Sequence, residues 1–278
     1  MSLLNISNFS KSYKDSKFSI ENFNLTINNG EVIGLIGNNG SGKSTIINSL
    51  VGNRSYDRGD FKFLNQDWES NSNQLKENVG VAFDDNRLPK DLNIQQLDCV
   101  FNNLYETWSP SIFKDLTEKF NLPKKSIINT FSRGMLMKLS IAVAMAHDTK
   151  LLILDESTAG IDISSRNEIL NMLKDFRNQN NAIIITSHIS SDLDTIATKL
   201  VFLKNGNKIL EMQKEILFNN YCVKQSTITD FESISKSGIL AFIEENNMIK
   251  YITEKDEKDN PINSLEEISY IIVEGELL

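Results

Sequence analysis

The chain has 278 residues and a formal net charge of −8, from 29 basic and 37 acidic side chains, which argues against a nucleic-acid-binding surface. It is 40% hydrophobic and 24% charged, enough for one large domain and a small appendage. It shows neither a signal-peptide pattern nor an apolar run near the roughly 20 residues that span a bilayer, so we expect a soluble chain whose two distant cysteines, Cys99 and Cys222, stay buried and reduced.

Alternating apolar and polar residues over positions 1–28 predict two strands, joined by a hairpin at residues 14–17. The apolar run Val32–Ile36 predicts a buried strand, and residues 46–51 continue with helical spacing. Between them, residues 37–44 fit the pattern G-x-x-x-x-G-K-[ST], which requires this context of strand, glycine loop and helix. An accidental glycine turn is the alternative, and the flanking elements argue against it.

The glycine loop predicts a binding site for nucleotide phosphates, because its backbone N–H groups can turn toward one point at a helix N-terminus. Lys43 would reach the β- and γ-phosphates, and the Ser44 hydroxyl would ligate Mg²⁺. The predicted binding residues are Gly37, Asn38, Asn39, Gly40, Ser41, Gly42, Lys43, Ser44 and Thr45.

A helical insertion is predicted after two short strands at residues 61–64 and 79–83. Its helices are expected from Ile94 to Leu104, from Pro110 toward Phe120 with Ser109 as N-cap, and in a short piece from Pro123. We expect the insertion, at about residues 86–135, to interrupt an α/β core.

The α/β core resumes with a helix at residues 133–146 that is apolar on nearly every side and is therefore expected to be buried. Leu151–Asp155 and Ala182–Thr186 predict buried strands, separated by a polar amphipathic helix at residues 164–179. Strands that alternate with helices predict a mostly parallel sheet covered on both faces.

A change of pattern after about residue 205 predicts a separate C-terminal part. A polar segment leads to two strands, at residues 239–242 and 249–252, and residues 264–267 resemble a capping box that opens a last helix. We assign residues 1–208 to a nucleotide-binding domain and residues 209–278 to a small α+β appendage.

Two acids end the buried strand Leu151–Asp155, where a P-loop enzyme places its Mg²⁺-coordinating aspartate. Asp155 is the predicted metal ligand, and Glu156 can polarise the attacking water as a general base. A pair of solvated acids at a strand end is the alternative, which the upstream glycine loop disfavours.

A second anion site is predicted at Phe131-Ser-Arg-Gly-Met135, where Ser132 and Gly134 open the apolar helix. One glycine loop and one spare anion site suggest two copies, head to tail, that share each nucleotide. At this point the sequence resembles the nucleotide-binding subunit of ABC transporters, whose signature usually reads Leu-Ser-Gly-Gly-Gln.

The resemblance implies a P-loop NTPase (RecA-like) core that binds ATP and Mg²⁺ between two subunits. Tyr13 matches the aromatic residue that stacks on adenine, although a tyrosine packed at a strand end is the alternative. Ala159-Gly-Ile-Asp162 matches the loop that crosses the dimer interface, which adds Asp162 to the nucleotide site. His188 matches the histidine that contacts the γ-phosphate, although a single histidine is more often structural.

Three positions depart from the family pattern. Asp84 stands where a glutamine usually senses Mg²⁺ and the membrane partner, and its carboxylate could still reach a water on the metal. Arg133 replaces a signature glycine and adds a cation near the nucleotide. Ser132, Arg133 and Gly134 are together expected to contact that nucleotide. Ser157 replaces a proline and removes no catalytic group.

The signature variant, residues 187–194 and the appendage resemble the exporter branch in Gram-positive bacteria, similar to ATPases of bacitracin-type resistance and phenol-soluble-modulin export. The resemblance implies an ATPase that drives a separate integral-membrane permease for peptides, toxins or antimicrobial compounds. Its expected partners are a second ATPase subunit, identical or related, and the permease, with no nucleic acid. It would be cytoplasmic and peripheral at the inner face of the cell membrane.

Two other functions stay open at the sequence level. The first is a soluble ATPase of this type acting on ribosomes or DNA, disfavoured by the single glycine loop, the absence of extended heptads and the acidic charge balance. The second is a nucleotide-gated regulatory module with little turnover.

Overall fold

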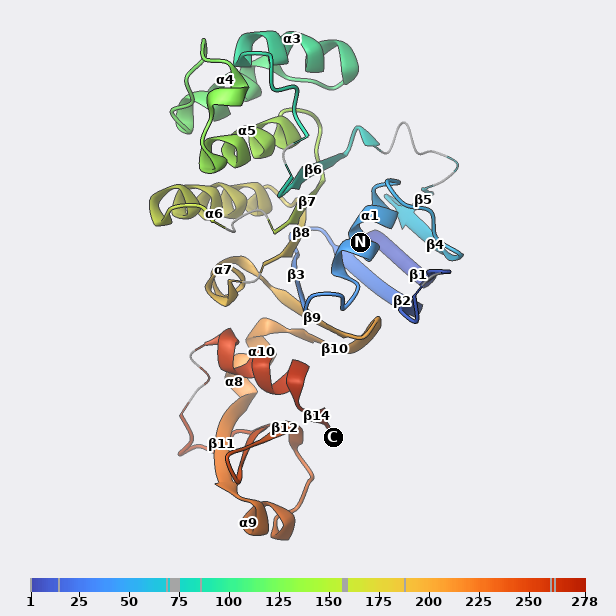
Figure 1. Cartoon of the computed structure of the whole chain (residues 1–278), viewed down its shortest axis with the longest axis vertical. Coiled ribbons are helices and arrows are strands. Elements are labelled where there is room, and N and C mark those ends of the chain that lie inside the picture. Colours follow the sequence, from blue (N-terminus) through green and yellow to red (C-terminus); the bar gives the residue numbers. More distant parts are fainter. Residues whose placement is uncertain are drawn as a thin grey trace.

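The computed structural model contains three sheets, arranged along one long axis (Figure 1). The core lies in the middle, with α3 and α4 at one end and a C-terminal sheet at the other. The structure describes residues 2–14, 16–68, 70, 76–85, 87–156, 160–187, 189–260, 262 and 264–278.

The described elements have the following bounds. The strands are β1 (Ser2–Ser12), β2 (Ser19–Asn28), β3 (Val32–Ile36), β4 (Arg58–Phe63), β5 (Gln66–Asp67), β6 (Val79–Phe83), β7 (Leu151–Asp155), β8 (Ala182–Thr186), β9 (Lys199–Lys204), β10 (Asn207–Gln213), β11 (Tyr221–Thr227), β12 (Ile239–Glu245), β13 (Met248–Glu254) and β14 (Glu276–Leu277). The helices are α1 (Lys43–Leu50), α3 (Ile94–Leu104), α4 (Pro110–Lys119), α5 (Arg133–Met145), α6 (Ile163–Asn178), α7 (Ser190–Ile196), α8 (Lys214–Asn220), α9 (Ile228–Ser233), α10 (Leu265–Glu274) and the 3₁₀ turn η1 (Ile128–Thr130).

The core sheet has six strands in the order β10-β9-β3-β8-β7-β6, and all of its pairings are parallel except that of β10 with β9. The predicted parallel α/β core is therefore confirmed. Because successive side chains of a strand point to opposite faces, the apolar runs feed two separate hydrophobic clusters. In β7, for example, Leu152 and Leu154 belong to one cluster, and Leu151 and Ile153 to the other.

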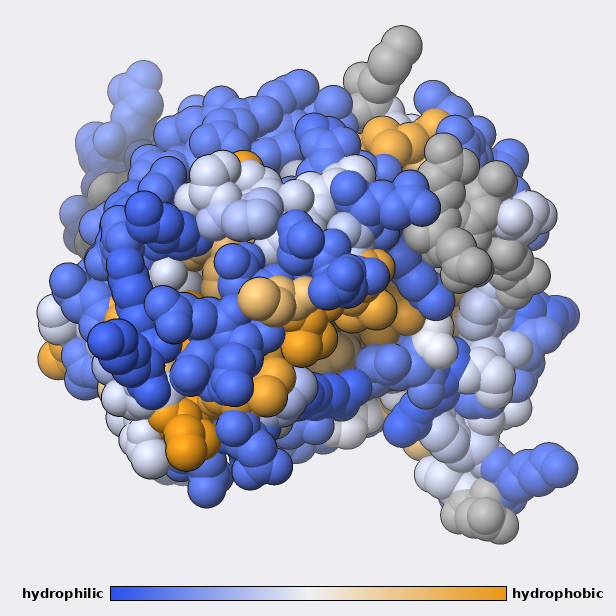
Figure 2. Space-filling model, turned by 90° about the horizontal axis from the view of Figure 1, so that it is seen from above, coloured by the Kyte–Doolittle hydropathy of each residue, from blue (hydrophilic) through white to orange (hydrophobic). Residues whose placement is uncertain are grey.

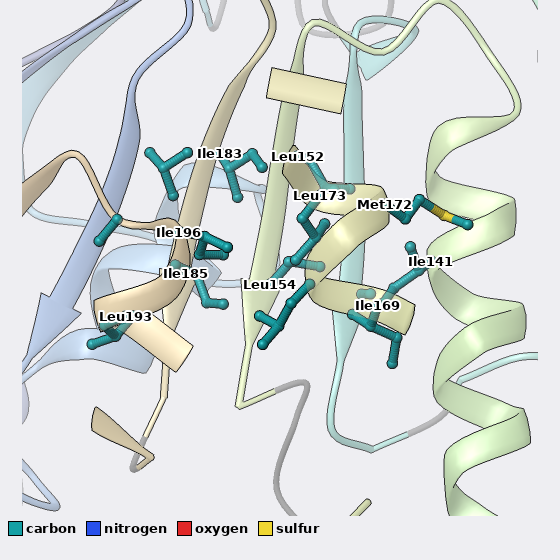
Figure 3. Packing of buried hydrophobic residues seen from close by; sticks show 14 of the residues in the cluster. Ile141, Leu152, Leu154, Ile169, Met172, Leu173, Ile183, Ile185, Leu193 and Ile196 are labelled. Atoms are coloured by element: carbon teal, nitrogen blue, oxygen red, sulfur yellow. The ribbon is translucent and has the colours of Figure 1, made fainter. Parts of the chain in front are cut away.

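Each face of the core sheet has its own cover. Helices α5, α6 and α7 lie on one face, and α1 with the antiparallel β2-β1-β4-β5 sheet lies on the other (Figure 1). On the helical face, Leu152 and Leu154 of β7 and Ile183 and Ile185 of β8 point toward α6 and α7, as Figure 3 shows. This two-sided burial explains why these strands contain almost no polar residue.

The helical insertion forms as predicted, with one correction. Asn93 and Gln96 cap each other's backbone at the start of α3, and the Ser109 hydroxyl accepts a hydrogen bond from the Ile112 N–H at the start of α4. The predicted helical piece from Pro123 is wrong, because residues 121–127 form turns and only the 3₁₀ turn η1 follows.

The C-terminal part begins later than predicted, because β10 pairs with β9 and extends the core sheet to Gln213. The strands predicted near residues 239–242 and 249–252 are β12 and β13, and the segment between β10 and β12 forms α8, β11 and α9. Helix α10 joins the two parts, since its buried residues belong to the same cluster as those of α6 and α7. Cys222 is buried as expected, whereas Cys99 on α3 is exposed.

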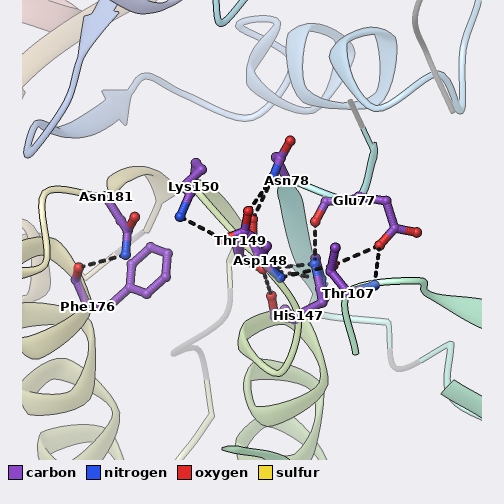
Figure 4. Close-up of polar contacts among 10 residues, drawn as sticks. Glu77, Asn78, Thr107, His147, Asp148, Thr149, Lys150, Phe176 and Asn181 are labelled. Atoms are coloured by element: carbon purple, nitrogen blue, oxygen red, sulfur yellow. Dashed lines mark hydrogen bonds and ion pairs between the residues drawn. The ribbon is translucent and has the colours of Figure 1, made fainter. Parts of the chain in front are cut away.

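A polar network ties the amino ends of β6 and β7 to the helical insertion (Figure 4). The Glu77 carboxylate accepts hydrogen bonds from the Thr107 N–H and hydroxyl, while the Glu77 carbonyl lies 2.7 Å from Nδ1 of His147. Burial lowers the pKa of His147. Since His147 precedes β7 and the two acids end it, this histidine lies at the opposite edge of the sheet from them.

Candidate active site

Most of the predicted site residues lie at the carboxyl ends of the parallel strands of the core sheet. Because β3, β8, β7 and β6 are parallel neighbours, the segments that follow them lie side by side. The glycine loop follows β3, Asp155 and Glu156 end β7, and Asp84 follows β6. The Asp84 N–H donates to the Asp155 carbonyl at 3.1 Å, which extends the pairing of β6 and β7 by one residue.

The glycine loop of residues 37–42 can follow its path only with glycine at key positions. A Cβ at residue 37 would lie 2.3 Å from the Leu203 carbonyl oxygen. Gly42, at φ 113°, is the N-cap of α1 and holds a backbone conformation that favours glycine. The Lys43 ammonium donates to the carbonyls of Gly37 at 2.6 Å and Asn38 at 3.2 Å. Burial lowers the pKa of Lys43, and the carboxylates of Glu156 and Asp155 oppose that shift.

The two acids share one buried hydroxyl. Thr186, at the end of β8, donates its hydroxyl to Asp155 Oδ1 at 2.7 Å and accepts the Glu156 N–H at 2.9 Å. Glu156 has a φ of 52°, so the chain turns sharply where the strand ends. Burial raises the pKa of Asp155, and hydrogen bonds from Thr186 and Ser44 oppose this.

Carboxylate and hydroxyl oxygens are the ligands that Mg²⁺ takes from proteins, usually with phosphate oxygens and water completing the shell. The Ser44 hydroxyl lies close enough to the Asp155 carboxylate to lower its pKa. The side chains present therefore fit a magnesium ion held beside the glycine loop.

A cavity of about 600 Å³ opens over the glycine loop, large enough for a nucleotide. Its wall contains Tyr13, which follows β1, together with residues 39–45, Arg54 and Glu156. The Tyr13 hydroxyl lies 3.0 Å from Thr45 Oγ1 and accepts a hydrogen bond from Arg54, whose guanidinium carbon lies 5.3 Å from the ring centroid. The tyrosine is thus half-buried at the cavity and is not part of a closed core.

The second predicted anion site lies at the N-terminus of α5. The Ser132 hydroxyl accepts the Met135 N–H at 3.3 Å, and a Cβ at Gly134 would lie 3.7 Å from Asp162 Oδ2. Arg133 forms an ion pair with Asp84. Among the described residues, the wall of the nucleotide-sized cavity contains none of these four signature and loop residues, Ser132, Arg133, Gly134 and Asp162.

Most predicted site residues therefore fall into two groups, one around the cavity and one at the α5 N-terminus. His188 lies outside the described residues, as do Ser157 and Ala159. Sequence reasoning missed Thr186, although a threonine that ends an otherwise apolar buried strand is a signal for it. It also missed Arg54, which lies in a polar turn with no distinguishing pattern.

Comparisons with known proteins agree with this arrangement. The sequence profile described as "ABC transporter" matches residues 20–159. The chain is 33% identical to the lantibiotic transport ATP-binding protein SrtF of Streptococcus pyogenes, over 78% of this chain and 96% of the relative. It is 28% identical to the Nod factor export ATP-binding protein I of Sinorhizobium fredii, over 78% of this chain and 64% of that protein.

Solved structures share the fold. An ATP-binding subunit of an ABC transporter matches with a TM-score of 0.71 at 22% identity, over 77% of this chain and 91% of its own. A dimeric ATP-binding cassette in a post-hydrolysis state, bound to ADP and phosphate, matches with a TM-score of 0.67 at 20% identity, over 76% and 98%.

Proposed function

Because this chain belongs to the ABC transporter family of ATPases, we propose that it is the subunit whose ATP hydrolysis drives a separate membrane exporter. The observation that carries the proposal is the meeting of Lys43, Ser44, Asp155 and Glu156 beside one nucleotide-sized cavity. The first relatives found are named for lantibiotic transport and Nod factor export, which favours export as the direction.

ATP would lie in the cavity over the glycine loop. The backbone N–H groups of residues 37–45 and the N-terminus of α1 would hold its phosphates, and the Lys43 ammonium would leave its carbonyl partners for the β- and γ-phosphates. Tyr13 is our candidate for stacking on adenine, since it stands at the cavity wall with its hydroxyl already bonded.

Magnesium would be held by Ser44 and Asp155. When bound, it would neutralise the charge that develops on the phosphates. Glu156 would accept a proton from the attacking water, and Thr186 would fix the two acids relative to each other. His188 is proposed to contact the γ-phosphate on the basis of its place after β8.

A second ATPase subunit, identical or related, would complete the site. The signature group of Ser132, Arg133 and Gly134, with Asp162 beside it, is absent from the described wall of this chain's own cavity. In a head-to-tail pair this group would face the ATP of the other subunit. Binding would then close the dimer and hydrolysis would reopen it.

A permease would contact the helical insertion. Seen from the α3 end, the surface is mostly hydrophilic, with one apolar hollow near its middle (Figure 2). A cavity of about 290 Å³, whose wall includes Val51, Trp68, Phe83 and Tyr105, lies between α1, β6 and α3. An amphipathic cytoplasmic helix of a permease has the chemistry to fill it. None of the helices in the described parts of the chain combines the length and hydropathy that a bilayer crossing needs. The proposed permease contact would place the chain at the inner face of the membrane.

The test is Glu156→Gln, which keeps the shape of the side chain and removes the base. We expect ATP turnover, measured as phosphate release, to fall about 100-fold or more while ATP still binds. Size-exclusion chromatography with light scattering should then show an ATP-dependent dimer. Glu232→Gln, an exposed change on α9, is the matched control and should leave both readouts unchanged. Turnover of Glu156→Gln at the wild-type rate would remove Glu156 from the mechanism.

A further inference from the structure

The two site positions that depart most from the family pattern contact each other. Asp84, where a glutamine is usual, forms an ion pair with Arg133, where a glycine is usual. A glutamine and a glycine could not form this pair, so each departure supplies the charge that the other requires. The pair links the loop after β6 to the first turn of α5.

The arginine is confined between two loops. Its Nη2 pairs with Asp84, while Nη1 lies so close to Gly160 that a Cβ at that position would approach it to 2.6 Å. Gly160 has a φ of 69° and belongs to the loop that leads from β7 to α6. The guanidinium therefore lies where the loops after β6 and β7 meet the signature residues.

Breaking the ion pair between Arg133 and Asp84 should cost little free energy. The Arg133 and Asp84 side chains are 50% and 43% exposed, and ion pairs this exposed contribute little to stability because water and salt screen them. A terminal phosphate offers more negative charge and several acceptor oxygens, which match the guanidinium fork better than one carboxylate does.

We propose that Asp84 holds Arg133 in reserve, and that Arg133 exchanges this carboxylate for the γ-phosphate of ATP on the facing subunit when two subunits close. The inference rests on the proposed head-to-tail dimer. Asp84 is then a positioning residue that opposes closure until ATP competes for Arg133. This role differs from that of a metal ligand, which would support turnover directly.

Epistasis separates these two roles of Asp84. Asp84→Asn frees Arg133 and should lower the ATP concentration for half-maximal turnover about three- to tenfold, with little change in kcat. Arg133→Gln should raise that concentration by a similar factor. In the double variant, Asp84→Asn should have no further effect, because the side chain that it releases is gone.

The experiment measures ATP turnover against ATP concentration for the full chain and the three variants. Dimer formation is measured in parallel by light scattering in the Glu156→Gln background. Asp85→Asn is the matched control, since this neighbouring acid pairs with Arg87 in its own loop at 3.1 Å and should leave the curve unchanged. Binding of a fluorescent ATP analogue to the isolated subunit should stay within twofold in all variants, which excludes misfolding as the cause.

The outcomes are distinguishable. If Asp84→Asn slows turnover equally with and without Arg133, Asp84 is a metal ligand and the exchange is overturned. An effect of Asp84→Asn no larger than that of Asp85→Asn overturns it as well. If Glu156→Gln shows no ATP-dependent association, the proposed dimer fails and the exchange fails with it.

Discussion

At the scale of single residues, the Thr186 hydroxyl holds Asp155 and Glu156 in position at the end of β7. It donates to the Asp155 carboxylate and accepts the backbone N–H of Glu156, and its side chain is fully buried. A hydroxyl is one of the few side chains that can do both at once, because it is a donor and an acceptor. The separation of the proposed metal ligand and the proposed general base is thus fixed by a third residue on the next strand.

Thr186→Val tests this arrangement. The valine keeps the shape but leaves a buried N–H without its partner, so we expect kcat for ATP to fall about 10- to 100-fold, as for other residues that orient a metal ligand. The free energy of unfolding should fall by about 1–3 kcal/mol. Steady-state kinetics and urea unfolding measure the two effects. Thr195→Val, an exposed threonine on α7, is the control. An unchanged kcat would show that Thr186 is only structural.

The raised pKa of Asp155 gives a prediction about stability. Burial raises the folded-state pKa of Asp155 above its ordinary value of 3.8. The carboxyl group therefore stabilises the fold fully only below pH 3.8. This contribution is lost as the pH rises through the folded-state pKa. At pH 7 without nucleotide, Asp155→Asn should therefore raise the melting temperature. The gain should shrink as the pH falls toward 3.8.

Melting curves of wild type and Asp155→Asn between pH 4 and pH 8 measure this difference. Asp91→Asn, at an exposed position, is the control and should change the melting temperature by the same small amount at every pH. ATP with Mg²⁺ should reverse the order at pH 7, because only the wild type keeps the proposed metal ligand. A lower melting temperature of Asp155→Asn in all conditions would contradict the argument.

At the scale of elements, the buried strands could be predicted from their hydrophobic pattern, whereas the strands at sheet edges could not. Strands β3, β7 and β8 were predictable because burial on both faces leaves them almost entirely apolar. Strands β10 and β11 lie at sheet edges and are polar and half-exposed, so no pattern separates them from a loop. The same limit applies to the site: a glycine loop is a local pattern, whereas the contacts of Arg54 and Arg133 depend on which distant segments meet.

Helix α10 shows how the C-terminal part is attached. It packs against α7 and β9 of the core and also against β12 and β13 of the C-terminal sheet. Ile271→Ala removes a fully buried side chain in this shared cluster and should lower the free energy of unfolding by about 2–5 kcal/mol. Urea unfolding, followed by far-ultraviolet circular dichroism, measures the loss. Glu266→Ala on the exposed face of the helix should cost far less, and equal losses would refute the shared core.

At the scale of the whole molecule, the C-terminal part reaches the glycine loop. Asn38 in the glycine loop donates its side-chain N–H to Glu274 Oε1 at 2.6 Å, at the end of α10. Lys204, which ends β9, donates to the Gly275 carbonyl at 2.9 Å and fixes the position of this helix end. A carboxylate is thereby held next to the loop that is proposed to bind phosphates, and its charge disfavours an anion there.

Removing this charge should strengthen ATP binding. Glu274→Gln keeps an acceptor oxygen for Asn38 and should lower the Kd for ATP about two- to fivefold at low salt, a factor typical of surface charge pairs. Raising the ionic strength should reduce the difference, because salt screens exposed charges. Titration of a fluorescent ATP analogue at two salt concentrations measures it, with Glu266→Gln at the other end of α10 as the control. If Glu274→Ala strengthens binding but Glu274→Gln does not, the hydrogen bond and not the charge restrains the loop. Unchanged affinity in both variants would show that the C-terminal part contacts the glycine loop without influencing ATP binding.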